Sequence, residues 1–199
     1  MTDLLMTMKN NKVSKDYKIF EDELFPHADA LYNFAFHLTY NSEDANDLVQ
    51  ETYLKAFNFI NSYQTGTNAK AWLFKILNNA FINEYRKKVK QPNKVDYEDI
   101  AAYHDTDDDS YIGFVDLRQE LFQDLIGDEI TTALNNLPVD FRTIILLCDI
   151  EGFTYEEISK IMDIPIGTVR SRLHRARNML KDKLKSYAEK LGFKDKRSK

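Results

Sequence analysis

The sequence predicts an all-α fold: two small helical domains joined by an acidic linker, with a helix-turn-helix in the second. Its 199 residues include only six Gly and four Pro, roughly 5% against a usual ~12%, which favours long helices. Apolar residues also recur at helical spacing on both sides of a stretch that has no clear periodicity. Charge is segregated as well: residues 94–130 hold 12 acidic and 2 basic side chains (net −10), and residues 166–199 hold 3 acidic and 12 basic (net +9). The overall charge of −5 therefore hides a basic end suited to nucleic acid.

These patterns predict an amino-terminal domain over residues 1–92, a linker over 93–115 and a carboxy-terminal domain over 116–199. The first domain ends at Pro92, and an amphipathic pattern resumes from Phe114 to Leu125. The first 16 residues match no motif, and the basic tail is expected to fray.

The first well-defined helix is expected to begin at Ser42, whose side chain can cap it, with Glu43 and Asp44 in the first turn. Its apolar positions face a core, and three polar residues remain as an outward edge suited to a partner: Asp47, Gln50 and Glu51.

A second helix is expected from about Ala69, with a buried stripe that contains Leu73 and Leu77. The other faces mix aromatic rings with Asn, Lys and Arg, a combination that can stack on and hydrogen-bond to bases removed from a duplex. Trp72 and Phe74 could instead complete the small core, and the residues alone favour that interpretation.

Residues 153–181 predict two helices joined by a tight turn. Thr154 and Glu157 have the spacing of a capping box, and Pro165 suits a first helical turn. The second helix has a buried stripe at Val169, Leu173, Ala176 and Leu180 and is basic elsewhere, which suits a DNA major groove. A solvated amphipathic helix with a charge run is the alternative.

Several classes of site are not expected. Cys148 is the only cysteine, so a disulfide framework and a thiolate metal cluster are excluded. The four histidines are scattered without ligand spacing, and no nucleophile–base pair is apparent, so we expect no metal, no cofactor and no catalysis. No apolar run approaches the ~20 residues of a membrane span, and no export signal is apparent, so a cytoplasmic protein without membrane insertion is expected.

Four motifs in order resemble an extracytoplasmic-function sigma factor, a small two-domain subunit of bacterial RNA polymerase. They are DLVQETYLKAF (47–57), AWLFKILNNAFINEYRKK (71–88), LP (137–138) and EGFTYEEISKIMDIPIGTVRSRLHRAR (151–177). The resemblance covers about residues 17–186. TGTNAKAWL (65–73) and INEYRKK (82–88) further resemble the subgroup controlled by redox-responsive, zinc-containing anti-sigma proteins.

The resemblance implies three sets of functional residues. Core polymerase would be bound by Asp47, Gln50 and Glu51. The minus-10 promoter element, as melted non-template strand, would contact Asn61, Thr65, Asn68, Lys70, Trp72, Lys75, Asn78, Asn79, Asn83 and Arg86. The minus-35 element, as duplex, would contact Thr168, Arg170, Ser171, Arg172, His174, Arg175 and Arg177.

The resemblance also implies control by an anti-sigma factor, possibly one that contains zinc. Two other classes remain: a helix-turn-helix activator that binds duplex DNA without joining polymerase, and a small recombinase. The activator would need an αβ receiver or ligand domain, and the recombinase a catalytic Ser with clustered Arg. Neither pattern is apparent.

Overall fold

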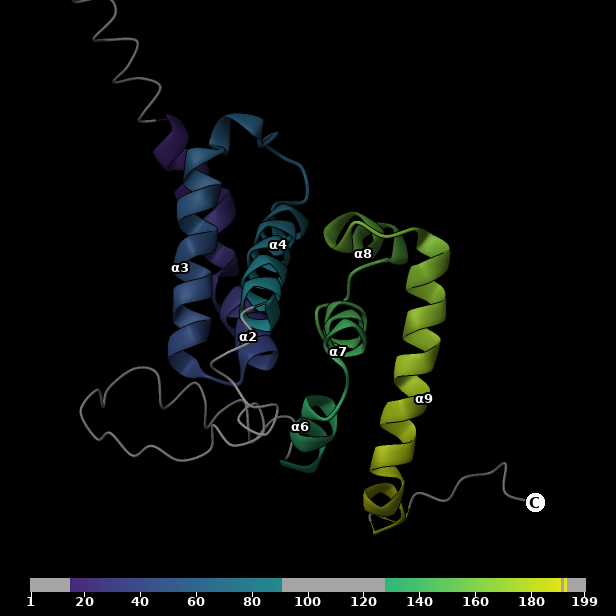
Figure 1. Cartoon of the computed structure of the whole chain (residues 1–199). Coiled ribbons are helices and arrows are strands. Elements are labelled where there is room, and N and C mark those ends of the chain that lie inside the picture. The colour runs from purple at the N-terminus through teal and green to yellow at the C-terminus, as the bar shows by residue number, and fades with distance from the viewer. Residues whose placement is uncertain (1–14, 91–127, 191, 193–199) are drawn as a thin grey trace, which may run out of the picture.

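The computed structural model describes residues 15–90, 128–190 and 192, and every regular element within these ranges is a helix (Figure 1). The predicted all-α class is therefore confirmed. The helices form two bundles, one on each side of a segment that includes the predicted linker 93–115. That linker and the amphipathic segment from Phe114 to Leu125 lie outside the described residues.

The amino-terminal bundle is built from three long helices, in which α2 packs on α3 and α3 packs on α4. Its centre consists of fully buried Leu31, Phe34, Leu48, Leu73 and Leu77. In chain order its elements are η1 (Phe20–Leu24), η2 (Phe25–His27), α2 (Ala28–Thr39), α3 (Ser42–Asn58), η3 (Ile60–Ser62) and α4 (Ala69–Lys90).

Capping side chains set where α3 and α4 begin. The expected cap at Ser42 was wrong by one residue: the Asn41 side chain accepts hydrogen bonds from the backbone N–H groups of Glu43 (2.8 Å) and Asp44 (3.0 Å). An amide oxygen at Asn41 reaches the unpaired N–H groups of the first turn, which places Ser42 inside the helix. α4 begins at Ala69 as predicted, and Asn68 Oδ1 accepts a 2.9 Å hydrogen bond from the Ala71 N–H.

Within residues 128–190, the carboxy-terminal bundle contains four α-helices and one π-helical turn. α7 and α8 both pack on α9, and α6 packs on α9 as well. Its elements are α6 (Asp128–Asn135), α7 (Val139–Ile145), η4 (Leu146–Ile150), α8 (Tyr155–Met162) and α9 (Ile166–Lys190).

α8 and α9 form the predicted helix-turn-helix. The capping box is present, because Thr154 and Glu157 satisfy each other's backbone N–H groups. α8 ends at Met162, and the capping residue Asp163 adopts a left-handed conformation (φ +54°); the Pro165 carbonyl accepts the first hydrogen bonds of α9. Val169, Leu173 and Ala176 are buried as predicted, so the opposite faces of α9 are free for another partner.

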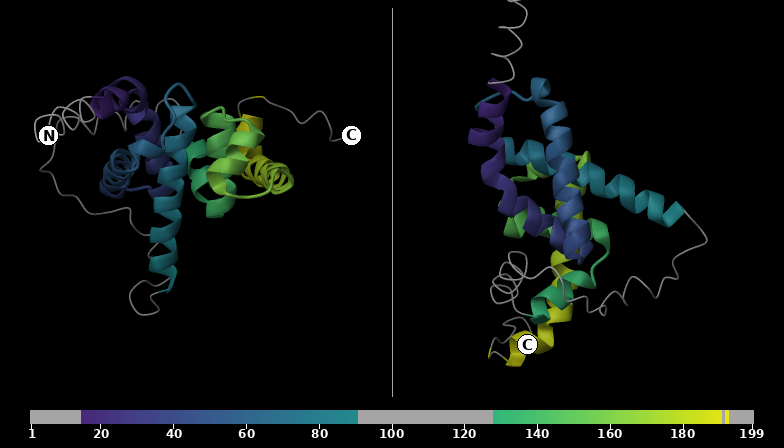
Figure 2. Two further views of the ribbon diagram at one scale, coloured as in Figure 1. Left: turned by 90° about the horizontal axis from the view of Figure 1, so that it is seen from above. Right: turned by 90° about the vertical axis from the view of Figure 1, so that its left-hand side faces the viewer.

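The two bundles pack against each other. α4 contacts α8 and α2 contacts α7, and the view from above shows these bundles side by side (Figure 2, left). One continuous apolar cluster includes core residues of both bundles, and the rings of Phe74 and Phe153 meet across the boundary with centroids 5.0 Å apart. α9 lies on the side of the carboxy-terminal bundle that faces away from α4 (Figures 1 and 2).

Candidate nucleic-acid interface

The exposed side of α9 carries cations beside its buried stripe. Arg170, Ser171, His174 and Arg175 are exposed, whereas Thr168 is half-buried in the first turn. The Ser171 hydroxyl donates a 3.1 Å hydrogen bond back to the Thr168 carbonyl. A helix with one buried stripe and cations on the remainder presents the surface that enters a major groove.

The other two arginines of this set are held by carboxylates of the same bundle. Arg172 Nη1 lies 3.0 Å from Asp140 Oδ2 of α7. Arg177 makes a bidentate pair with Asp149 of η4, with Nη2–Oδ1 at 2.5 Å and Nε–Oδ2 at 3.1 Å. Such a fork is more ordered than a single exposed ion pair. Arg177 therefore ties α9 to η4, in addition to any contact that it makes with DNA.

Cys148 lies beside this fork, with its Sγ 3.7 Å from Arg177 Nη2. Its side chain is half-buried. Burial raises the pKa of the Cys148 thiol, and the neighbouring Asp149 carboxylate acts in the same direction. The thiol therefore stays protonated at neutral pH, which makes it a poor nucleophile.

α4 presents a row of amides and cations to solvent. Lys75, Asn79, Asn83 and Arg86 are all exposed, and their spacing of three to four residues places them along one line of the helix. This combination can hydrogen-bond base edges and hold phosphates. The sequence predicted these four as minus-10 contacts, and the structure brings them onto one surface.

Two residues outside the predicted stripe of α4 lie in its core: Phe74, for which the residues alone favoured a core position, and Asn78, which was expected to contact DNA. Phe74 is completely buried and packs on Phe34 with ring centroids 4.9 Å apart, and Asn78 is only 4% exposed. The expectation of an accessible Asn78 was therefore wrong, because the buried stripe of α4 is wider than Leu73 and Leu77 alone indicate. Trp72 is half-buried, and its ring packs on Tyr63 at 5.0 Å.

The loop before α4, residues 61–68, is shaped by a glutamate that the sequence did not single out. Glu23 Oε2 accepts hydrogen bonds from the Tyr63 hydroxyl (2.6 Å) and from the Gly66 N–H (3.0 Å), and Gly66 adopts φ +76°. The Tyr63 hydrogen bond is the main cause that lowers the pKa of Glu23, whereas burial raises the pKa of Tyr63 to about 12. Asn61 and Thr65 are exposed on this loop. Glu23 lies about 40 residues away in sequence, so no local pattern could have identified it.

Asn68 and Lys70, at the start of α4, contact the other bundle. Asn68 Nδ2 donates to Glu157 Oε1 at 2.5 Å. Lys70 Nζ lies 2.8 Å from Glu151 Oε2 and donates to the Glu151 carbonyl at 3.0 Å. The same ammonium lies over the rings of Phe74 and Phe153, at 5.6 and 5.1 Å from their centroids. Two of the ten expected minus-10 contacts are thus engaged within the chain.

A third surface lies on α3, on the side remote from the carboxy-terminal bundle (Figure 1). Asp47, Gln50 and Glu51 are exposed as predicted, and Glu51 pairs with Lys55 at 2.6 Å. Leu54 continues the same face one turn later and is 67% exposed, a feature that the sequence prediction missed. An apolar side chain rimmed by polar ones matches the layout of protein-docking surfaces, whose centre is apolar and whose rim is polar.

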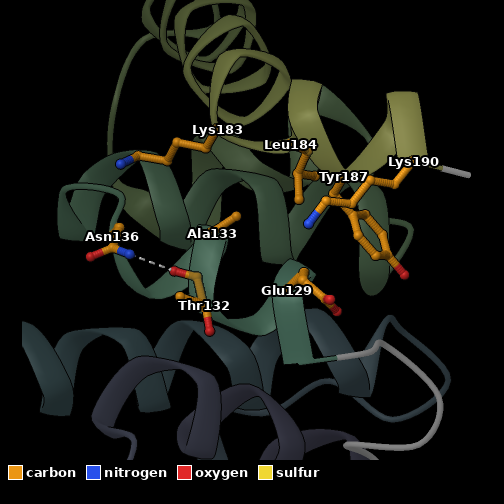
Figure 3. A pocket seen from close by; sticks show the side chains of 8 residues that line it. All are labelled: Glu129, Thr132, Ala133, Asn136, Lys183, Leu184, Tyr187 and Lys190. Atoms are coloured by element: carbon orange, nitrogen blue, oxygen red, sulfur yellow. Dashed lines mark hydrogen bonds between the residues drawn. The ribbon is translucent and has the colours of Figure 1, made fainter. Parts of the chain in front are cut away.

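The far end of α9 packs over α6 and leaves an open pocket of about 480 Å³ between them (Figure 3). Lys183 and Tyr187 of α9 line it opposite Glu129 and Thr132 of α6. Lys183 is 13 residues beyond Arg170, about 20 Å along the helix. The pocket therefore belongs to the junction of α6 and α9 and is separate from the first turns of α9, where Arg170 lies.

Within residues 15–90 and 128–190, no group of three or more His, Cys, Asp or Glu side chains could hold a metal ion. None of the helices in the described part of the chain is long and apolar enough to cross a membrane.

Comparisons with known proteins match both bundles. Residues 26–91 match the family model for Sigma-70 region 2, and residues 127–180 match that for Sigma-70, region 4. The chain is 36% identical to the ECF RNA polymerase sigma factor EcfG of Rhodopseudomonas palustris, over 80% of this chain and 81% of that protein. It is also 36% identical to SigE of Mycolicibacterium smegmatis, over 84% of this chain but only 62% of SigE.

A solved structure agrees with these matches. The sigma factor RpoE from Bartonella quintana, determined in complex with the anti-sigma factor NepR, superimposes with a TM-score of 0.62. It is 35% identical and covers 84% of this chain, which in turn covers 98% of RpoE.

The fold and surfaces define a helical DNA-binding protein with two separate recognition units. The chain belongs to the extracytoplasmic-function family of RNA polymerase sigma factors. Matches to both sigma regions favour this family over the helix-turn-helix activator, which would share only the second unit.

Proposed function

We propose that this protein binds core RNA polymerase in the bacterial cytoplasm and directs it to a specific set of promoters. The amino-terminal bundle binds polymerase and the melted minus-10 element, and the carboxy-terminal bundle binds the minus-35 duplex. The observation that carries the proposal is the presence, on one chain, of two exposed surfaces that contain cations and differ in chemistry: arginines on α9, and amides with cations on α4.

The two surfaces suit two states of DNA. α9 offers arginines on a helix that is narrow enough for a major groove, as duplex recognition requires. α4 and the loop before it offer amides, cations and the half-buried Trp72. This set suits bases that have left the stack, each of which gains about 1–3 kcal/mol from an aromatic partner.

Polymerase docking is assigned to α3. Asp47, Gln50 and Glu51 form an exposed polar edge, and Leu54 supplies an apolar anchor beside them. The buried residues of the same helix, Leu48 and Thr52, belong to the core that α3 forms with α2 and α4, so polymerase and minus-10 contacts do not compete for the same side chains.

Regulation is assigned to an anti-sigma protein, as in the solved complex of the related RpoE with NepR. Where the anti-sigma protein contains zinc, that protein binds the metal and senses the redox state. A lone Cys148 with a raised pKa is unsuited to that task. The proposal assigns no catalytic step to this chain, since nucleotide addition belongs to the polymerase.

In vitro transcription with core polymerase on a promoter library tests the proposal. Addition of the protein should produce new, defined start sites, with shared sequences about 10 and 35 base pairs upstream. Start sites that are the same with and without the protein would contradict it. Duplex binding without any effect on polymerase would favour an activator instead.

A further inference from the structure

We infer that the free chain is self-inhibited: its carboxy-terminal bundle occupies the start of the minus-10 surface, and this closed arrangement must open before a promoter can be bound. The inference rests on the proposed function, because it concerns access to the minus-10 surface. It names a partner for that surface within the chain itself.

The closed interface is built from specific polar contacts. The Lys70 ammonium contacts both the side-chain carboxylate and the backbone carbonyl of Glu151, and the Glu151 side chain is only 9% exposed. Glu157 accepts from Asn68, and the same Glu157 side chain closes the capping box of α8. Removing one partner of an ion pair this buried strongly destabilises the closed arrangement, because the other charge is then left buried without a partner.

A second set of contacts closes the other end of the interface. Arg142 of α7 is almost fully buried and lies over the Tyr40 ring of α2, with its guanidinium carbon 4.8 Å from the ring centroid. Phe74 and Phe153 also pack edge to face across the boundary. The interface therefore combines apolar and polar contacts, as stable protein interfaces do.

The closed arrangement cannot span a promoter. The two elements lie about 25 base pairs apart, as their names state, which is roughly 85 Å along a duplex. In the closed chain α4 packs on α8, and α8 packs on α9. Two such helix contacts separate α4 from α9 by only about 20 Å. Simultaneous contact with both elements therefore requires the bundles to separate.

Closure affects the two DNA surfaces unequally. Asn68 and Lys70 are engaged in the interface, whereas α9 lies on the far side of its bundle with Arg170 and Arg175 exposed (Figure 2). The closed chain should therefore bind minus-35 duplex normally and bind the minus-10 strand weakly. The apparent affinity for that strand falls in proportion to the open fraction.

The first test needs no mutation. A water-soluble carbodiimide joins an amine to a carboxylate that touches it, so closed wild-type chain should yield an intramolecular amide between Lys70 and Glu151, identified by peptide mass spectrometry. The pair Lys88 and Glu84, 3.1 Å apart within α4, is the positive control because it does not depend on closure. Formation of the control link without the Lys70–Glu151 link would overturn the inference.

The second test opens the interface by charge reversal. Glu151→Lys places a second ammonium beside Lys70, whereas Glu156→Lys makes the same change in charge at an exposed site on α8. Binding of the full chain to a single-stranded oligonucleotide of a mapped minus-10 non-template strand is measured by fluorescence anisotropy. Glu151→Lys should bind at least about tenfold more tightly than Glu156→Lys, or 1.4 kcal/mol. Equal affinities of the two variants would overturn the inference.

The third measurement is independent of DNA. Small-angle X-ray scattering should give a larger radius of gyration for Glu151→Lys than for wild type, and the double variant Glu151→Lys/Lys70→Glu should restore the smaller value. An unchanged radius in the single variant would also overturn closure. If no variant bound the minus-10 strand, the assignment of that surface, and with it the blocking role, would be wrong. Cross-linking and scattering would still report closure.

Discussion

Two arginines of α9 differ in the ion pairs that they make within the chain. Arg170 is exposed, with no ion pair among the described residues, whereas Arg177 is clamped in a bidentate pair by Asp149. A side chain that is free before binding can adapt to a phosphate or a base edge. One that is already ordered contributes more to holding the helix in place.

We therefore predict that Arg170→Ala weakens binding to minus-35 duplex by about 1–3 kcal/mol if Arg170 contacts a base. If it contacts a phosphate, the salt dependence should become less steep by about one ion. Arg177→Ala should instead lower the thermal stability of the carboxy-terminal bundle. Anisotropy titrations at several salt concentrations, together with thermal unfolding, distinguish these effects. Unchanged affinity and salt dependence in Arg170→Ala would remove this residue from the DNA surface.

The hydroxyl of Tyr63 is the second residue-scale prediction. Tyr63→Phe removes the 2.6 Å hydrogen bond to Glu23 and leaves that carboxylate with the Gly66 N–H alone. Stability should fall by about 1–2 kcal/mol, and minus-10 strand binding should weaken because the loop is held less firmly. Chemical denaturation and strand titration measure the two effects. Tyr85→Phe is the control, since Tyr85 is exposed on α4, and a loss of equal size there would refute the role of the Tyr63 hydroxyl.

Single side chains are where sequence reasoning was least complete. It placed Lys75, Asn79 and Arg86 outside the buried stripe of α4, because helical periodicity alone fixes which residues share a face. It misplaced Asn78, because the width of a buried face depends on the neighbouring helices and not on the helix itself. Glu23 was missed for the same reason: its partners Tyr63 and Gly66 are brought to it only by the fold.

Elements were predicted more completely than side-chain environments. The capping box at Thr154 and the start of α4 at Ala69 depend on residues within four positions of each other, so the sequence contains the whole interaction. The start of α3 shows the limit. Asn41 and Ser42 are both good caps, and only the backbone geometry selects Asn41.

The exposed face of α3 gives a prediction at this scale. Replacing Asp47, Gln50 and Glu51 together by Ala should weaken binding to core polymerase while leaving the fold unchanged, because all three side chains point to solvent. A pull-down with core polymerase and a circular dichroism spectrum check the two parts. A matched triple change on an exposed part of α9, at Lys181, Asp182 and Lys185, should leave polymerase binding intact. Full retention of binding in the α3 variant would move the docking surface elsewhere.

The packing of one bundle on the other is a property of the whole molecule that the sequence did not predict. Its contacts join residues about 80 to 100 positions apart, such as Phe74 with Phe153 and Tyr40 with Arg142, and no periodic pattern connects such distant segments. The buried histidine at this boundary, His37, is only 4% exposed and faces Tyr40 and Arg142. Burial, with a contribution from Arg142, lowers its pKa from 6.5 to about 4.

This lowered pKa predicts how stability depends on pH. Above pH 6.5 His37 is neutral in both the folded and unfolded chains and has no effect. Between pH 6.5 and about 4 the unfolded chain takes up the proton and the folded chain does not. The free energy of unfolding therefore decreases as the pH is lowered through this range, by up to about 3 kcal/mol. Urea denaturation from pH 7.5 to 4.5 measures the slope. His37→Gln, which stays neutral, should flatten it, and an unaltered slope would show that other groups cause the dependence.

The contact between Lys70 and Glu151 lies within a single chain, and this decides how closure responds to concentration. An intramolecular equilibrium is the same in dilute and concentrated solution, whereas binding to polymerase, DNA or an inhibitor follows mass action. Raising the amount of protein in the cell therefore multiplies closed and open molecules alike and leaves the open fraction unchanged. Only a partner that binds one form more tightly than the other can shift that fraction, so the response of this protein depends on which partners are present rather than on its own abundance.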